Sequence, residues 1–195
     1  GVSVSGIASA VSDNGLGIAS IAYNAKLMIV KACADNNATV IYKGYEGIKY
    51  AADNGAHIIN CSFSGPYGSN FGQDIVKYAI SKGSLIIACA GNSNSSAPEY
   101  PAAYEGVLAV SAVDQNDKKS DFSSYGSHIS ISAPGVVYSS KNGNKYGLVA
   151  GTSFSAPMVS SAAALVRSRF PAFDMSQVAE QLKVSADNID ELNPR

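Results

Sequence analysis

Residues 84–90 read SLIIACA, an uninterrupted apolar run that ends at Gly91-Asn92. A strand of this composition buries both faces, which is typical of parallel sheets covered by helices on both sides. Similar short runs occur at 56–62 (AHIINCS), 107–113 (VLAVSAV) and 129–133. Because helical patterns separate these runs, we predict an α/β fold: a three-layer, mostly parallel sheet with helices on both faces.

Periodicity and turn residues predict the remaining elements. Helices are expected at 4–11, 40–54, 74–81, 153–170 and 176–185. The run at 26–32 (KLMIVKA) is predicted to be another buried strand. Residues 136–140 and 146–150 flank Asn142-Gly143, which predicts a hairpin. With no internal repeat and no low-complexity linker, the 195 residues are expected to form a single domain.

Composition excludes several classes of function. Hydrophobic residues make up 46% of the chain, charged residues only 15%, and the net charge is −1. Nucleic-acid binding needs a basic face, so we expect no such partner. No apolar run reaches the roughly 18 residues of a membrane helix, so no membrane insertion is expected. Cys33, Cys61 and Cys89 lie in or beside apolar runs, and we interpret them as buried, reduced thiols rather than catalytic or zinc-binding ones.

Polar residues and glycines follow two of the predicted strands, at the sheet edge where ligands bind. Asn60 to Gly65 (NCSFSG) follows one strand, and Gly91-Asn92 follows the next. Gly151-Thr152-Ser153 precedes the long Ala-rich helix, which places Ser153 at a helix N-terminus. Free N–H groups and the helix dipole stabilise negative charge there. Taken alone, a serine in this position is more often an ordinary N-cap.

Together, these segments resemble the subtilases, the subtilisin-like serine proteases. The segment at 151–159 (GTSFSAPMV) resembles the nucleophile block of the family. Residues 90–93 (AGNS) resemble its oxyanion block, and 60–65 resemble its substrate-binding strand. Further matches follow in the family order from Gly1 to about Leu182. The resemblance implies a subtilisin-like fold, serine endopeptidase activity, and an extracellular or cell-envelope location.

The resemblance also assigns roles to individual residues. It implies that Ser153 Oγ is the nucleophile, and that the Asn92 side-chain amide and the Ser153 backbone N–H bind the oxyanion.

An extended polypeptide substrate is implied to bind along Ser62, Phe63 and Ser64 through their backbone groups. Gly91 is implied to wall the first specificity pocket. Ser64 stands where the family usually has glycine, and its side chain is expected either to crowd the substrate strand or to narrow that pocket.

The other two catalytic residues of the family have no match in the 195 residues. Its Asp motif is absent, and Gly1-Val2-Ser3 aligns with the residues that directly follow the catalytic His of the family. His57 is expected at the strand end away from the site, and His128 is expected to be exposed, so neither is predicted to act as the base. The sequence resembles a subtilase domain truncated at both ends. We expect the segment alone to be inactive, with the missing N-terminal segment or a propeptide as its partner.

Two alternatives bear on this interpretation. An α/β-hydrolase needs a His after its nucleophile, and no His follows Ser153, which excludes that class. A non-catalytic subtilase-like module, which binds peptides or serves as a scaffold, would also explain the absent Asp and His. The presence of both Ser153 and Asn92 favours the protease.

Residues 12–17 (SDNGLG) lie where many subtilases have a calcium-binding loop. Asp13 and Asn14 are suitable oxygen ligands for calcium. Asp-Asn-Gly also forms a turn without any metal, so both interpretations stay open. A structural calcium ion is the one cofactor that the resemblance suggests, and no catalytic cofactor is expected.

Overall fold

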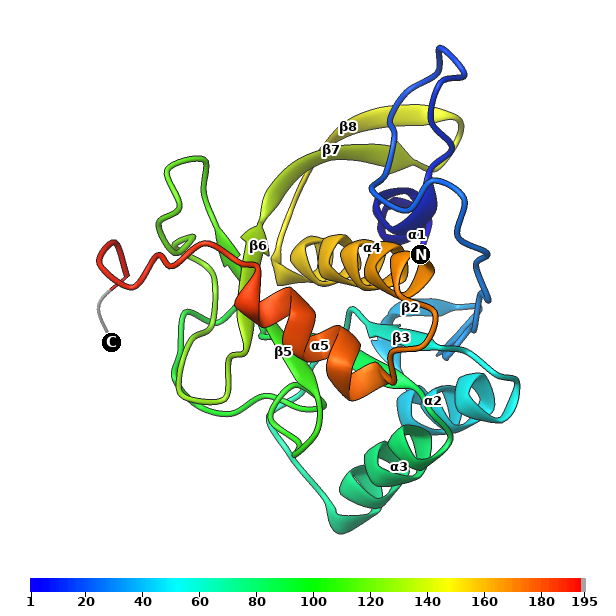
Figure 1. Cartoon of the computed structure of the whole chain (residues 1–195), viewed down its shortest axis with the longest axis vertical. Helices are drawn as coiled ribbons and strands as arrows, with labels where there is room; N and C mark the ends of the chain where they lie inside the picture. Colours follow the sequence, from blue (N-terminus) through cyan, green and yellow to red (C-terminus); the bar gives the residue numbers. More distant parts are fainter. Residues whose placement is uncertain (194–195) are drawn as a thin grey trace.

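The computed structural model describes residues 1–193, apart from the side chains of Ala38 and Thr39. Its centre is a four-stranded parallel sheet in the order β3-β4-β5-β6 (Figure 1). The strands are β3 (Ile58–Cys61), β4 (Leu85–Cys89), β5 (Leu108–Val113) and β6 (Ile131–Pro134). All four were expected from their apolar runs, and the parallel α/β fold is confirmed.

Two pairs of helices cover the two faces of this sheet (Figure 1). They are α2 (Gly44–Asp53) with α3 (Asn70–Ser81), and α4 (Thr152–Arg169) with α5 (Met175–Val184). In β4, Ile86 and Ala88 pack with the first pair, whereas Leu85, Ile87 and Cys89 pack with the second. Since every residue of β4 is buried, the strand stays apolar throughout. The three-layer arrangement is therefore the one predicted.

A hairpin and the first helix lie beyond the sheet, next to α4 (Figure 1). Strands β7 (Val136–Lys141) and β8 (Lys145–Ala150) pair antiparallel about the predicted turn, which confirms the hairpin. Helix α1 (Val2–Ser9) packs on both α4 and β7. The hydroxyl of Ser3 donates to the Ser140 carbonyl at 2.6 Å, which ties α1 to β7.

The predicted strand at 26–32 is wrong. This run forms no strand, and Leu27, Met28 and Ile29 are 46%, 43% and 71% exposed. Val30 packs against the core cluster that α2 and α3 share with the sheet. An apolar run becomes a strand only when a neighbouring strand accepts its backbone hydrogen bonds, and β3 pairs with β4 alone among the described residues.

The start of the predicted helix at 40–54 is also wrong. Residues before Lys43 form a small antiparallel pair, β1 (Cys33–Ala34) with β2 (Asn37–Ile41), and α2 begins only at Gly44. Helix α3 begins four residues earlier than predicted, because the Ser69 hydroxyl caps it by accepting from Gly72 N at 3.0 Å. None of the described helices is long and apolar enough to span a membrane.

Candidate active site

The N-terminus of α4 is capped by a residue from a distant part of the chain. Gly151 occupies the N-cap position with φ +140° and has no side chain to cap the helix. Asn92, just beyond the end of β4, supplies the missing acceptor: its Oδ1 accepts from Thr152 N at 2.8 Å and from Thr152 Oγ1 at 3.0 Å. The carboxyl end of β4 and the start of α4 are thus held together.

This cap fixes the direction of the Asn92 amide. Because Oδ1 faces Thr152, the donor group Nδ2 is directed elsewhere, and it has no hydrogen-bond partner among residues 1–193. The backbone N–H of Ser153, in the first turn of α4, has no partner in the described residues either. Two unpaired donors therefore lie at the positive end of a helix, an arrangement that can stabilise an oxyanion.

Ser153 is held against the residues that follow β3. Its Oγ donates to the Ser62 carbonyl at 3.3 Å, and its carbonyl accepts from Ser62 Oγ at 2.7 Å. Ser62 Oγ in turn accepts from Asn60 Nδ2 at 2.8 Å. The Ser153 hydroxyl thus lies beside the segment that was predicted to bind substrate.

The other predicted substrate-binding residues differ in position. Gly91 lies in the site: its N–H donates to Thr152 Oγ1, and its carbonyl accepts from the same hydroxyl, both at 3.2 Å. The Phe63 side chain packs against the α2 and α3 core instead, so only its backbone is available. The Ser64 side chain is exposed and donates to Glu99 Oε2 at 2.5 Å.

Sequence reasoning assigned no role to the side chains of Thr152 and Glu99. Thr152 is fully buried, and its hydroxyl is hydrogen-bonded to the Gly91 carbonyl and to Asn92 Oδ1, which joins the start of α4 to the end of β4. Its position between a glycine and the predicted nucleophile was the available signal. Glu99 offered no comparable signal, because its contacts exist only in the folded chain.

Neither histidine is positioned to act on Ser153. His57 precedes β3, whereas Ser62 follows it. The whole strand therefore separates His57 from Ser62, at about 3.3 Å of rise per residue. His128 is half-buried rather than exposed as predicted, and its Nε2 is buried without a partner. Burial lowers the pKa of His128, which the negative charge of Glu99 partly opposes.

The cysteines are free thiols. Cys61 and Cys89 are buried as predicted, but Cys33 is only half-buried because it lies in the small β1-β2 pair. Burial raises the pKa of both buried thiols, and that of Cys89 reaches about 11. Ser153 Oγ also lies within hydrogen-bond distance of Cys89 Sγ, at 3.9 Å, so the buried thiol lies next to the predicted nucleophile.

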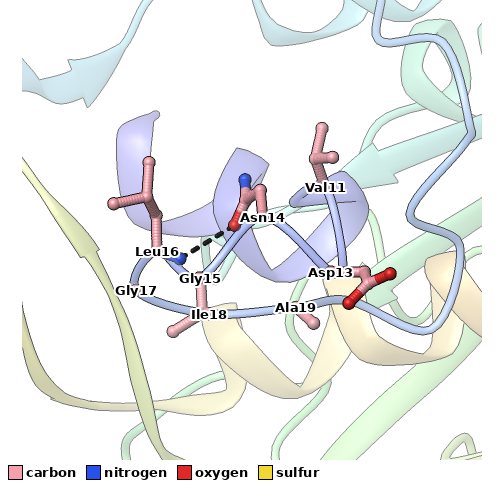
Figure 2. Close-up of a pocket in the computed structure, with 8 residues that line it drawn as sticks. All are labelled: Val11, Asp13, Asn14, Gly15, Leu16, Gly17, Ile18 and Ala19. Carbon is pink, nitrogen blue, oxygen red and sulfur yellow. Dashed lines mark hydrogen bonds between the residues drawn. The ribbon is translucent and has the colours of Figure 1, made fainter.

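The candidate calcium loop forms a shallow pocket lined by Val11 and residues 13–19 (Figure 2). Asn14 Oδ1 accepts from Leu16 N at 3.0 Å, and the exposed Asp13 side chain points away from it (Figure 2). The described residues contain no cluster of three or more His, Cys, Asp or Glu side chains. Calcium takes six to eight oxygens. One free carboxylate and one engaged amide do not fit such a site, whereas they do fit a turn.

The comparisons with known proteins show the family of the chain. The model of the subtilase family matches residues 1–194. The chain belongs to the subtilase family. It is 38% identical over 190 residues to thermitase of Thermoactinomyces vulgaris, covering 97% of this chain and 67% of thermitase. It is 39% identical over 187 residues to a thermostable alkaline protease of Halalkalibacterium halodurans, covering 95% of this chain and 52% of that protein.

A solved structure of a protease from Pseudoalteromonas arctica has the same fold, with a TM-score of 0.86 and 29% identity. The match covers 95% of this subtilase chain and 63% of the other. The chain thus spans about half to two thirds of the length of these three proteins.

Proposed function

We propose that Ser153 and Asn92 belong to the active site of a serine endopeptidase. Ser153 is the nucleophile, and the Asn92 amide with the Ser153 N–H forms the oxyanion hole. The observation that carries the proposal is the Asn92 amide, whose oxygen is engaged by Thr152 while its nitrogen stays free. A donor fixed in this way costs no reorganisation when negative charge develops.

In the proposed reaction, Ser153 Oγ attacks the carbonyl carbon of a peptide bond and its proton passes to a general base. The carbonyl π bond breaks, and its electron pair moves to the oxygen. Asn92 Nδ2 and the Ser153 N–H donate to that oxyanion. The electron pair of the oxyanion then re-forms the carbonyl double bond while the C–N bond breaks, and the base returns the proton to the leaving amine nitrogen. Water hydrolyses the resulting ester on Ser153 Oγ, which regains its proton.

The base in this proposal is a histidine outside the 195 residues. Neither His57 nor His128 contacts Ser153, so the segment by itself is expected to hydrolyse peptides negligibly. The sequence order points to the residue before Gly1 as this histidine. The N-terminal segment that carries this histidine would complete the site as a partner of the 195 residues, and a propeptide is the other proposed partner.

A non-catalytic peptide-binding module is the competing function. It would need the backbone of residues 62–64, but it would not need a free amide donor beside a serine at a helix N-terminus. That pairing supports the protease. The proposed substrate is an extended polypeptide along residues 62–64, and the proposed location is extracellular or at the cell envelope.

Labelling of the full-length protein with a fluorophosphonate tests the proposal. We expect one adduct per molecule, mapped to Ser153 by mass spectrometry, and none in Ser153→Ala. Ser155→Ala is the matched control, because the Ser155 hydroxyl is buried and donates to the Pro134 carbonyl at 3.1 Å. Absence of labelling in the folded full-length protein would favour the non-catalytic module.

A further inference from the structure

Glu99 lies beside the segment that is proposed to bind substrate. Its neighbour Tyr100 pairs with Gly65 through two backbone hydrogen bonds, Gly65 N to Tyr100 O at 2.9 Å and Tyr100 N to Gly65 O at 2.8 Å. This bridge fixes Glu99 next to Ser64. The half-buried side chain of Glu99 is thereby directed at the residues that follow β4.

Among the described residues, the Glu99 carboxylate accepts hydrogen bonds only from hydroxyl groups. Oε2 accepts from Ser64 Oγ at 2.5 Å, and Oε1 accepts from Ser93 Oγ and Ser124 Oγ at 3.2 Å each. Ser124 is fully buried, and its Oγ also accepts from Ser93 N at 3.2 Å, which directs its proton toward the carboxylate. No cation lies within ion-pair distance of Glu99 in the described part of the chain.

The carboxylate also lies one residue away from the oxyanion donor. A Cβ on Gly91 would overlap both carboxylate oxygens of Glu99, so the carboxylate packs directly against the Gly91 backbone. Gly91 immediately precedes Asn92. In a bound peptide, the substrate residue whose carbonyl reaches Asn92 and Ser153 must place its side chain close to Gly91 and Glu99. Its side chain is attached to the Cα atom that is bonded directly to the reacting carbonyl carbon.

We propose that Glu99 is a specificity-determining residue that selects lysine or arginine at the position immediately before the scissile bond. The inference rests on the proposed function, since it assumes cleavage at Ser153. A carboxylate that is half-buried and satisfied only by neutral donors attracts a cation more strongly than one in water. An arriving ammonium or guanidinium group would replace the exposed Ser64 hydroxyl, whereas an apolar side chain would desolvate the carboxylate without compensation.

Lys119 forms no ion pair with Glu99, and burial favours the uncharged form of His128, whose pKa Glu99 partly raises. Lys119 Nζ, the ammonium group of the adjacent segment, is engaged by Asn94 Oδ1 at 2.7 Å and by the carbonyls of Ser120 and Ser123 at 3.2 and 3.3 Å. The negative charge of Glu99 also helps to raise the pKa of Cys89.

Matched peptide substrates test the inference on the full-length protein. The peptides differ only in the residue before the scissile bond: Lys, Arg, Ala or Phe. We expect kcat/KM for Lys and Arg to exceed that for Ala and Phe by about tenfold or more. In Glu99→Gln, which keeps the shape and one acceptor, we expect the Lys and Arg values to fall by about tenfold or more and the Ala value to be retained.

Glu105→Gln is the control. Glu105 is an exposed carboxylate that pairs with Lys77, so its substitution should not change the preference. A preference for Ala or Phe in the wild type, or an unchanged Lys preference in Glu99→Gln, would overturn the inference. Fluorophosphonate labelling separates the two levels. Labelling of Ser153 without a Lys preference overturns the role of Glu99 alone, whereas absence of labelling overturns the proposed function and the inference with it.

Discussion

Asn92 and the loop at 11–19 both belong to short polar motifs, but long-range hydrogen bonds hold the first and a local hydrogen bond holds the second. Asn92 accepts from Thr152, 60 residues away, and Ser62 donates to Ser153, 91 residues away. In the loop, Asn14 accepts from Leu16, two residues away. Long-range bonds force one geometry on the side chains they join, whereas a local bond is sufficient only for a turn.

The largest effect expected from this difference concerns catalysis. Asn92→Asp keeps an oxygen for Thr152 but removes the Nδ2 donor. We expect kcat of the full-length protein to fall by about 10²–10³ with little change in KM. Asn14→Ala should leave both unchanged. Equal activity of Asn92→Asp and the wild type, in steady-state peptide hydrolysis, would show that the free donor is not used.

Thiol reactivity distinguishes Cys89, which lies beside Ser153, from Cys33, which lies in the small β1-β2 pair. Cys33 should react first with iodoacetamide in the native protein, because it is only half-buried. The raised pKa of Cys89 keeps its thiol protonated between pH 7 and 9, so we expect labelling of it to be about 100-fold slower than in denatured protein and to increase only as the pH approaches 11. Peptide mapping by mass spectrometry measures each site. Early labelling of Cys89 would contradict its burial.

A smaller effect is expected from the hydroxyl that joins the two segments of the site. Thr152→Val keeps the shape but removes the hydrogen bonds to Gly91 and Asn92. We expect a loss of about 1–3 kcal/mol in the free energy of unfolding, measured with urea. Ser185→Ala, whose hydroxyl bonds locally to the Gln181 carbonyl, should cost less. Equal costs would mean that the long-range bonds add nothing.

The smallest effect is expected in the loop. Because one free carboxylate and one engaged amide fit a turn better than a calcium site, we expect that adding calcium and then removing it with a chelator leaves the Tm unchanged. Asn14→Ala should cost no more than about 1 kcal/mol, the value of one exposed hydrogen bond. A calcium-dependent rise in Tm that Asp13→Ala abolishes would restore the metal-site interpretation.

The sheet was largely predictable from sequence, because strands buried on both faces must be apolar throughout. Strand β4 satisfies that rule at every position. The same rule failed at 26–32, where Leu27 and Ile29 are exposed. Composition reports that a segment can be buried, but it does not report whether a neighbouring strand is present to pair with it.

The candidate site was predictable in its residues but not in its contacts. The motifs at 90–93 and 151–159 named Asn92 and Ser153 in advance. Which atom of Asn92 faces Thr152, and therefore which atom remains a donor, depends on how the end of β4 meets the start of α4. The position of Glu99 depends likewise on the backbone bridge between Tyr100 and Gly65.

The sequence by itself determined the layers, the order of the motifs and the kinds of chemical group at the strand ends, since these follow from local periodicity and residue type. Only the tertiary structure decided the orientation of the Asn92 amide, the direction of the Phe63 side chain into the core and the approach of the Glu99 carboxylate to Gly91. These features need hydrogen bonds and packing between residues far apart in the chain. No local pattern can encode such contacts, because each depends on where the folded sheet places its neighbours.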